Sequence, residues 1–203
     1  MNNSTDHFAN KSKSWDMNSK RVQNAQEIAK AIDNTVTLHK DMTLMDFGAG
    51  TGLLSFCLSD KISKVIAVDN SASMLEEFHS KASEFKCETE ILQIDLSTQL
   101  IERTFDGIIS SMTLHHLENI QALFSKFYEM LEKDGFIALA DLDTEDGTFH
   151  SDNTGVFHYG FDRNLLQDIA QKVGFKDISF QTVSIIKKPQ CDFSVFLMTA
   201  HKD

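Results

Sequence analysis

The chain has 203 residues, enough for one α/β domain with a full hydrophobic core, and its 30 acidic and 19 basic side chains give a formal net charge of −11. Because nucleic-acid binders need concentrated basic side chains to displace counterions, this charge argues against a nucleic-acid partner. The three cysteines follow no metal-ligand spacing, which predicts a reduced, cytoplasmic protein without structural zinc. No segment resembles a signal peptide or a membrane span, so no membrane partner is expected.

The first sixteen residues are polar, and a segment of this composition stays mobile unless it docks on the rest of the chain. Apolar residues at helical spacing follow and predict an amphipathic helix over Lys20–Ile32. Asn18 or Ser19 is expected to cap it.

A glycine turn stands at the centre of the sequence pattern. Thr43–Phe47 predicts a buried strand, and a helix is expected after the turn. Gly48, Gly50 and Gly52 allow the backbone to bend sharply and to come close to a ligand. The spacing differs from the dinucleotide fingerprint Gly-x-Gly-x-x-Gly. A turn that merely joins a strand to a helix is the alternative interpretation.

Asp46 lies two residues before the first glycine, where its charge would repel a pyrophosphate and attract a cationic group. Asp46, Gly48, Gly50 and Gly52 together match motif I, Asp/Glu-x-Gly-x-Gly-x-Gly, and the chain resembles the class I S-adenosylmethionine-dependent methyltransferases over most of its length. The resemblance implies S-adenosyl-L-methionine as cofactor and S-adenosyl-L-homocysteine as product.

The same resemblance implies an α/β fold with a Rossmann-like, doubly wound, seven-stranded sheet that is mostly parallel and ends in a C-terminal antiparallel hairpin. Residues 1–40 are interpreted as an N-terminal helical cap of the same domain. Residues 41–203 are interpreted as the S-adenosylmethionine-binding methyltransferase domain.

The second predicted strand, Lys64–Val68, ends in Asp69-Asn70-Ser71. By the family resemblance, Asp69 receives the ribose hydroxyls, a role that suits a carboxylate because it can accept two hydrogen bonds. Ser71 is able to cap the next helix, and Met74 is expected near the adenine. For these last two residues, plain helix capping and core packing are the alternatives.

The third predicted strand, Glu90–Ile94, is followed by Asp95 and Leu96. The resemblance implies that the Asp95 carboxylate accepts from the adenine amino group and that the next backbone N–H donates to the ring. A single aspartate at a strand end is weak support by itself. Three glycines and three spaced aspartates in this order are a stronger pattern.

The fourth predicted strand, Phe105–Ser110, leads into a segment that contains Ser111, Met112, His115 and His116. Ligands of open α/β sheets bind outside the carboxyl ends of the strands, so this segment is expected to face the reactive part of the site. His115 and His116 are candidate bases for an acceptor that must lose a proton. Packing or helix capping by these imidazoles is the alternative.

The residues expected to contact the cofactor all lie at or just after the ends of the first four predicted strands: Asp46, Gly48, Ala49, Gly50, Asp69, Asn70, Ser71, Met74, Asp95, Leu96, Ser111 and Met112.

The later patterns predict, in order, a helix over Ile120–Leu131, a parallel strand over Phe136–Ala140, a helix over Leu165–Val173, and a hairpin of Phe175–Lys187 and Asp192–His201. The long segment 141–160 carries aromatic residues among polar ones and is interpreted as a substrate lid. Asp141, His150 and His158 within it match no compact ligand signature, so no metal site is predicted.

These patterns lead to the hypothesis of a cytoplasmic enzyme that transfers a methyl group from S-adenosylmethionine to a small-molecule acceptor. A protein or RNA-end methyltransferase is an alternative, but neither an Asn-Pro-Pro-Tyr-type motif nor a basic face is present. A non-catalytic cofactor-binding module that acts through a partner is the other alternative. No oligomeric state is predicted.

Overall fold

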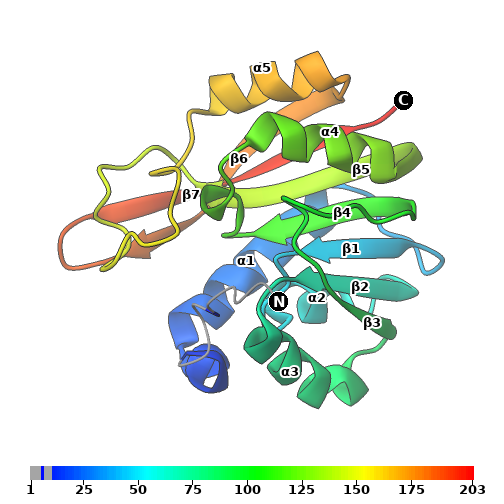
Figure 1. The fold of residues 1–203 in the computed structure, drawn as a ribbon, viewed down its shortest axis with the longest axis horizontal. Helices are drawn as coiled ribbons and strands as arrows, with labels where there is room; N and C mark the ends of the chain where they lie inside the picture. Colours follow the sequence, from blue (N-terminus) through cyan, green and yellow to red (C-terminus); the bar gives the residue numbers. More distant parts are fainter. Residues whose placement is uncertain (1–5, 7–10) are drawn as a thin grey trace.

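Over the part of the chain that the computed structural model describes, Asp6 and residues 11–203, the protein forms a seven-stranded sheet in the order β3-β2-β1-β4-β5-β7-β6 (Figure 1). The strands are β1 (Thr43–Phe47), β2 (Lys64–Asp69), β3 (Glu88–Gln93), β4 (Phe105–Ser111), β5 (Leu131–Leu142), β6 (Lys176–Lys187) and β7 (Asp192–His201). The α-helices are α1 (Ser19–Thr35), α2 (Leu53–Leu58), α3 (Ala72–Lys81), α4 (Ile120–Met130) and α5 (Arg163–Val173), and the 3-10 helices are η1 (Ser12–Met17), η2 (Ala82–Glu84) and η3 (Leu114–His116).

The first five strands pair in parallel, whereas β7 pairs antiparallel with both β5 and β6. The expected mostly parallel sheet with a C-terminal antiparallel hairpin is therefore confirmed. The chain adds β2 and β3 on one side of β1, and then β4 and β5 on its other side. The strand order therefore reverses between β1 and β4, and their carboxyl ends border the crevice in which such sheets bind ligands.

Both faces of the sheet are covered by helices, which explains why its central strands are mostly apolar. Neighbouring residues of β1 point to opposite faces, so Leu44 packs with α1, α2 and α3, and Met45 packs with α4 and α5. Figure 1 shows these two helical layers on either side of the sheet.

The strand β5 begins earlier than the sequence pattern predicts. Phe105 pairs with Leu131 and Gly107 with Phe136, so three extra residues of β5 bulge out of the ladder between these two pairs. Asp134 in this bulge has a φ of 63°. Residues 133–135, which lie between the helix and the strand expected from the sequence, thus form an irregularity within β5.

The helix α1 begins where Asn18 caps it, because the Asn18 side chain accepts from the backbone N–H groups of Lys20 and Arg21. Its apolar side packs against α2, and polar contacts fix it to β6. Among these, Gln181 donates to the Thr35 hydroxyl at 2.7 Å. The helix therefore joins the segment that follows the glycine turn to the C-terminal hairpin.

The N-terminal segment was expected to be mobile, but its residues 1–5 and 7–10 lie outside the part of the chain that the structure describes. Within the described part, η1 is docked: the Asp16 carboxylate accepts from Thr51 at 2.6 Å and pairs with Lys81. No helix in the described part of the chain has the length and apolarity needed to cross a membrane.

Replacing Ile28 with Ala is expected to lower the free energy of unfolding by about 2–5 kcal/mol, because this fully buried side chain of α1 would leave a cavity against the core. Lys30→Ala, on the exposed side of the same helix, is the matched control and should change stability by less than about 0.5 kcal/mol. Urea unfolding measures both values. Equal effects of the two substitutions would contradict the docking of α1.

Candidate active site

The glycine turn after β1 bends with positive φ angles of 67° at Gly48, 54° at Gly50 and 83° at Gly52. An added Cβ at Gly48 would come within 2.7 Å of the Thr113 side chain, so this position has no room for one. An added Cβ at Gly50 would meet no atom of the described residues within 4 Å. Gly50 therefore faces open space in which a ligand can approach the backbone.

Asp69 at the end of β2 joins the glycine turn to the next helix. One carboxylate oxygen accepts from the Gly50 N–H at 2.8 Å, and the other accepts from the Ser71 N–H at 2.8 Å. Burial raises the pKa of Asp69, whereas these backbone hydrogen bonds lower it. Each oxygen keeps a second lone pair, so the carboxylate can still accept from a ligand hydroxyl.

Asp46 is buried beneath the same turn, with 2% of its surface exposed. Its Oδ2 atom has no hydrogen-bond partner among the described residues. Burial raises the pKa of Asp46 to about 7 against hydrogen bonding from Ser55, and repulsion by Asp69 adds to the rise. A buried carboxyl oxygen without a donor beside an open glycine turn fits a ligand that brings a cationic donor.

The residues after Asp69 hold α3 in place. Ser71 is buried, and its hydroxyl accepts from the Met74 N–H at 3.3 Å, so the predicted capping role is confirmed. Met74 is buried in turn. The Ser71 hydroxyl also donates to the Asp6 carboxylate at 2.8 Å, which places an N-terminal acidic residue beside Asp69.

Asp95 lies after β3, where its Oδ1 atom accepts from the N–H and the hydroxyl of Ser97 at 2.8 and 2.6 Å. Leu96 is buried and packs into the core on the α4 side of the sheet. The proposed contacts of these two residues with an adenine ring stay predictions, as does the contact of Ala49 and Asn70 with the cofactor.

The segment after β4 reaches the glycine turn. Ser111 ends the strand, and Met112 has a φ of 58°, an uncommon conformation for a side chain of this size. Its N–H donates to the Ala140 carbonyl at 2.8 Å. The next residue, Thr113, contacts Gly48, so η3 starts directly against the turn.

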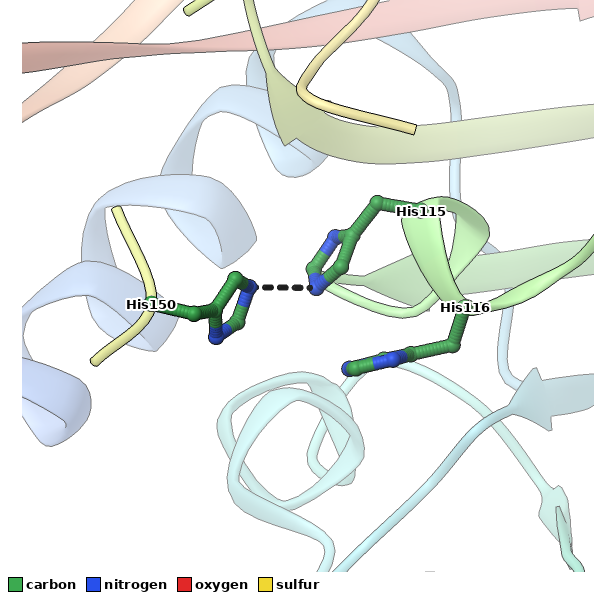
Figure 2. Close-up of side chains that lie close together, drawn as sticks. All are labelled: His115, His116 and His150. Atoms are coloured by element: carbon green, nitrogen blue, oxygen red, sulfur yellow. Dashed lines mark hydrogen bonds between the residues drawn. The ribbon is translucent and has the colours of Figure 1, made fainter. Parts of the chain in front are cut away.

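Three imidazoles come together next to this segment: His115 and His116 from η3, and His150 from the loop between β5 and α5 (Figure 2). One ring nitrogen of each lies within 4.8 Å of the others. The His115 and His150 Nε2 atoms are 3.2 Å apart. The structure thus brings His150 to the two histidines that were predicted as candidate bases.

His115 is buried and is oriented by Asp141, whose Oδ1 atom lies 2.7 Å from His115 Nδ1. His158 lies elsewhere, with its Nε2 atom 2.8 Å from the Leu117 carbonyl oxygen. Burial lowers the pKa of His150 to about 4, and repulsion by His115 and His116 adds to the effect, so this imidazole is neutral at pH 7.

Several site residues could not be found from the sequence. Asp6 and Asp16 lie in a polar N-terminal segment that shows no periodicity, and Thr51 is one of the variable residues of the glycine motif. Their grouping at the glycine turn depends on tertiary contacts, for which no sequence signal was available.

Comparisons with known proteins agree with this geometry. Residues 44–135 match the family described as "Methyltransferase domain". These residues form a class I S-adenosylmethionine-dependent methyltransferase domain, and S-adenosylmethionine is the cofactor of this family.

Among individual proteins, the chain is 27% identical over 168 residues to an uncharacterised methyltransferase of Schizosaccharomyces pombe; the match covers 74% of this chain and 57% of that protein. A possible histamine N-methyltransferase from Thermotoga maritima has a similar fold, with a TM-score of 0.70, 18% identity and coverage of 97% and 98% of the two chains.

Phosphoethanolamine N-methyltransferase 2 of Haemonchus contortus, solved with phosphomonomethylethanolamine and S-adenosylhomocysteine, aligns with a TM-score of 0.68 and 16% identity over 87% of this chain and 52% of that one. These structural likenesses establish the fold. The chain spans only about half to three fifths of the length of the Haemonchus enzyme and of the fission yeast relative.

Replacing Asp46 with Asn tests the burial of this carboxyl group. Because its pKa is about 7 in the folded protein against 3.8 ordinarily, only the unfolded chain releases the proton between about pH 4 and pH 7, and the free energy of unfolding falls as the pH rises through this window. The difference between these two pKa values corresponds to about 4 kcal/mol in the free energy of unfolding. Urea unfolding across this range should show a shallower fall in Asp46→Asn.

The matched control is Asp41→Asn, which changes an exposed aspartate near the other end of β1 and should keep the wild-type pH profile. Parallel profiles for wild type and Asp46→Asn would contradict the raised pKa.

Proposed function

We propose that this protein is a methyltransferase that binds S-adenosylmethionine at the carboxyl ends of β1, β2 and β4 and transfers the methyl group to a small-molecule acceptor. The observation that carries the proposal is the open space at Gly50, whose N–H donates to Asp69, while an added Cβ would meet no atom of the described residues within 4 Å. A catalytically silent module would share this feature, so the experiments below include a test of transfer.

The chain's own residues have distinct proposed roles in holding the cofactor. Asp69 accepts from the ribose hydroxyls with the lone pairs that Gly50 and Ser71 leave free. Asp46 supplies negative charge to the cationic amino acid part, because its Oδ2 atom has no donor among the residues that the structure describes. The segment of Asp95 and Leu96 borders the adenine.

S-adenosylmethionine, when bound, supplies an activated methyl group on a positively charged sulfur. The protein's task is then to align the acceptor and to exclude water. The loop between β5 and α5 is suited to this task because its Phe157 and His158 N–H groups donate to the His115 carbonyl at 2.9 and 3.2 Å. We interpret this loop as the substrate lid.

Two imidazoles can remove a proton from a methyl acceptor that must lose one. The Asp141 carboxylate accepts from His115 Nδ1, which leaves the lone pair on His115 Nε2. The Gly155 carbonyl oxygen accepts from His116 Nδ1 at 2.7 Å. We propose that one of these imidazoles acts as the base for a hydroxyl or thiol acceptor.

Several features support a small acceptor. The net charge of −11 is unfavourable for RNA, and the Haemonchus enzyme of similar fold was solved with a small phosphorylated amine. We interpret residues 1–40 as a helical cap over the methyltransferase domain of residues 41–203, because α1 and η1 dock beside the glycine turn. A cytoplasmic location is part of the proposal and is supported by free cysteines at 57, 87 and 191.

Replacing Gly50 with Val is expected to abolish S-adenosylmethionine binding in titration calorimetry, because the side chain would fill the open space and strain a φ of 54°. The matched control is Gly155→Val, which also has positive φ and open space but lies in the loop between β5 and α5. It should bind the cofactor as the wild type does. Unchanged affinity in Gly50→Val would refute the proposed cofactor site.

Incubation of the protein with methyl-labelled S-adenosylmethionine and a deproteinised metabolite extract is expected to yield a labelled small molecule, which chromatography with radiometric detection measures. Gly50→Val is the control and should yield none. Cofactor binding without any labelled product would favour the silent module, and label in added protein or RNA would favour the other alternative.

A further inference from the structure

We propose that His115, His116 and His150 form a binding site for a divalent transition-metal ion of the zinc class. Zinc is held in proteins by imidazole nitrogens, and three histidines with one open position are a known ligand set for it. The three rings approach one another from two separate elements, η3 and the loop between β5 and α5, as Figure 2 shows.

The spacing of the imidazoles fits a tetrahedral ion. With metal–nitrogen bonds of about 2.0–2.1 Å, two ligands of such an ion lie about 3.3–3.4 Å apart. The His115 and His150 Nε2 atoms are 3.2 Å apart. The third ring nitrogen lies within 4.8 Å of both, and His116 is only partly buried, so a small rotation of its side chain completes the set.

The hydrogen bonds behind two of the rings engage their Nδ1 atoms. A carboxylate and a carbonyl only accept, so His115 Nδ1 donates to Asp141 and His116 Nδ1 donates to the Gly155 carbonyl. Both Nε2 atoms then carry lone pairs. A carboxylate or carbonyl behind a histidine is the usual outer partner of a metal ligand.

Asp141 is itself held firmly. It is fully buried, and its two oxygens also accept from the backbone N–H groups of Leu142 at 2.8 Å and His115 at 3.3 Å. These bonds fix the orientation of the His115 ring before an ion arrives. Such preorganisation strengthens binding because less conformational freedom is lost.

The spacing of the three histidines in the sequence does not indicate this site, and the sequence therefore predicted no metal site. His150 is 35 residues from His115, and the adjacent pair of histidines is not a recognised ligand motif. An ion in this site would have His115 as a ligand and not as a base. Its fourth position would be open to water or, on the proposed function, to a thiol or hydroxyl acceptor whose pKa it would lower.

The metal site can be tested on the full chain without cofactor or acceptor. After chelator treatment and dialysis, titration with Zn²⁺ at micromolar concentration is expected to saturate at one equivalent per chain. Titration with Co²⁺ should produce the intense visible absorption of a tetrahedral complex. His150→Ala and His116→Ala should each weaken Zn²⁺ binding at least about 10-fold, and Asp141→Asn by about 10–100-fold.

His39→Ala is the matched control, because His39 is exposed and lies before β1; it should bind Zn²⁺ as the wild type does. Thermal melting checks that each variant is folded, and the loop residue His150 provides a variant that does not disturb the core. Absence of stoichiometric binding in the wild type, or unchanged affinity in folded His150→Ala, would overturn the metal site. Neither result depends on whether S-adenosylmethionine binds.

Discussion

The hydrogen bond from the Gly50 N–H to the Asp69 carboxylate connects the two central elements of the site. It links the glycine turn after β1 to the end of β2, and the other Asp69 oxygen continues to the start of α3. Because both oxygens accept backbone N–H groups, the carboxylate remains tolerable in a buried position. The open space at Gly50 depends on the shape that this bond gives the turn, and Asp46 is buried beneath the same turn.

Much of the fold could be predicted from the sequence because local and tertiary preferences agree there. The apolar run Thr43–Phe47 is the strand β1 with the predicted bounds, and Asn18 and Ser71 cap their helices. The start of β5 was predicted five residues too late. A bulge is fixed by pairing with β4, and the polar residues at 132–134 resemble an ordinary turn.

The candidate site could be predicted in part. Motif I placed Asp46 and the glycines, since the spacing of residues within one turn is a local property. The histidine cluster could not be predicted, because His150 reaches His115 only through the path of a long loop. The contact of Asp6 with Ser71 could not be predicted from the sequence either. Contacts between distant segments depend on the packed structure, and a single sequence contains no periodic signal for them.

The position of α1 also affects the geometry of the whole sheet. This helix contacts α2 on one side and β6 and β7 on the other, and its hydrogen bonds to β6 lie at both Thr35 and Lys20. Strands in an open sheet rotate relative to one another, and this rotation accumulates from the centre to the edge. A rigid helix attached at two points along an edge strand limits that rotation. The sheet twist on the hairpin side is therefore set partly by a segment that belongs to no strand.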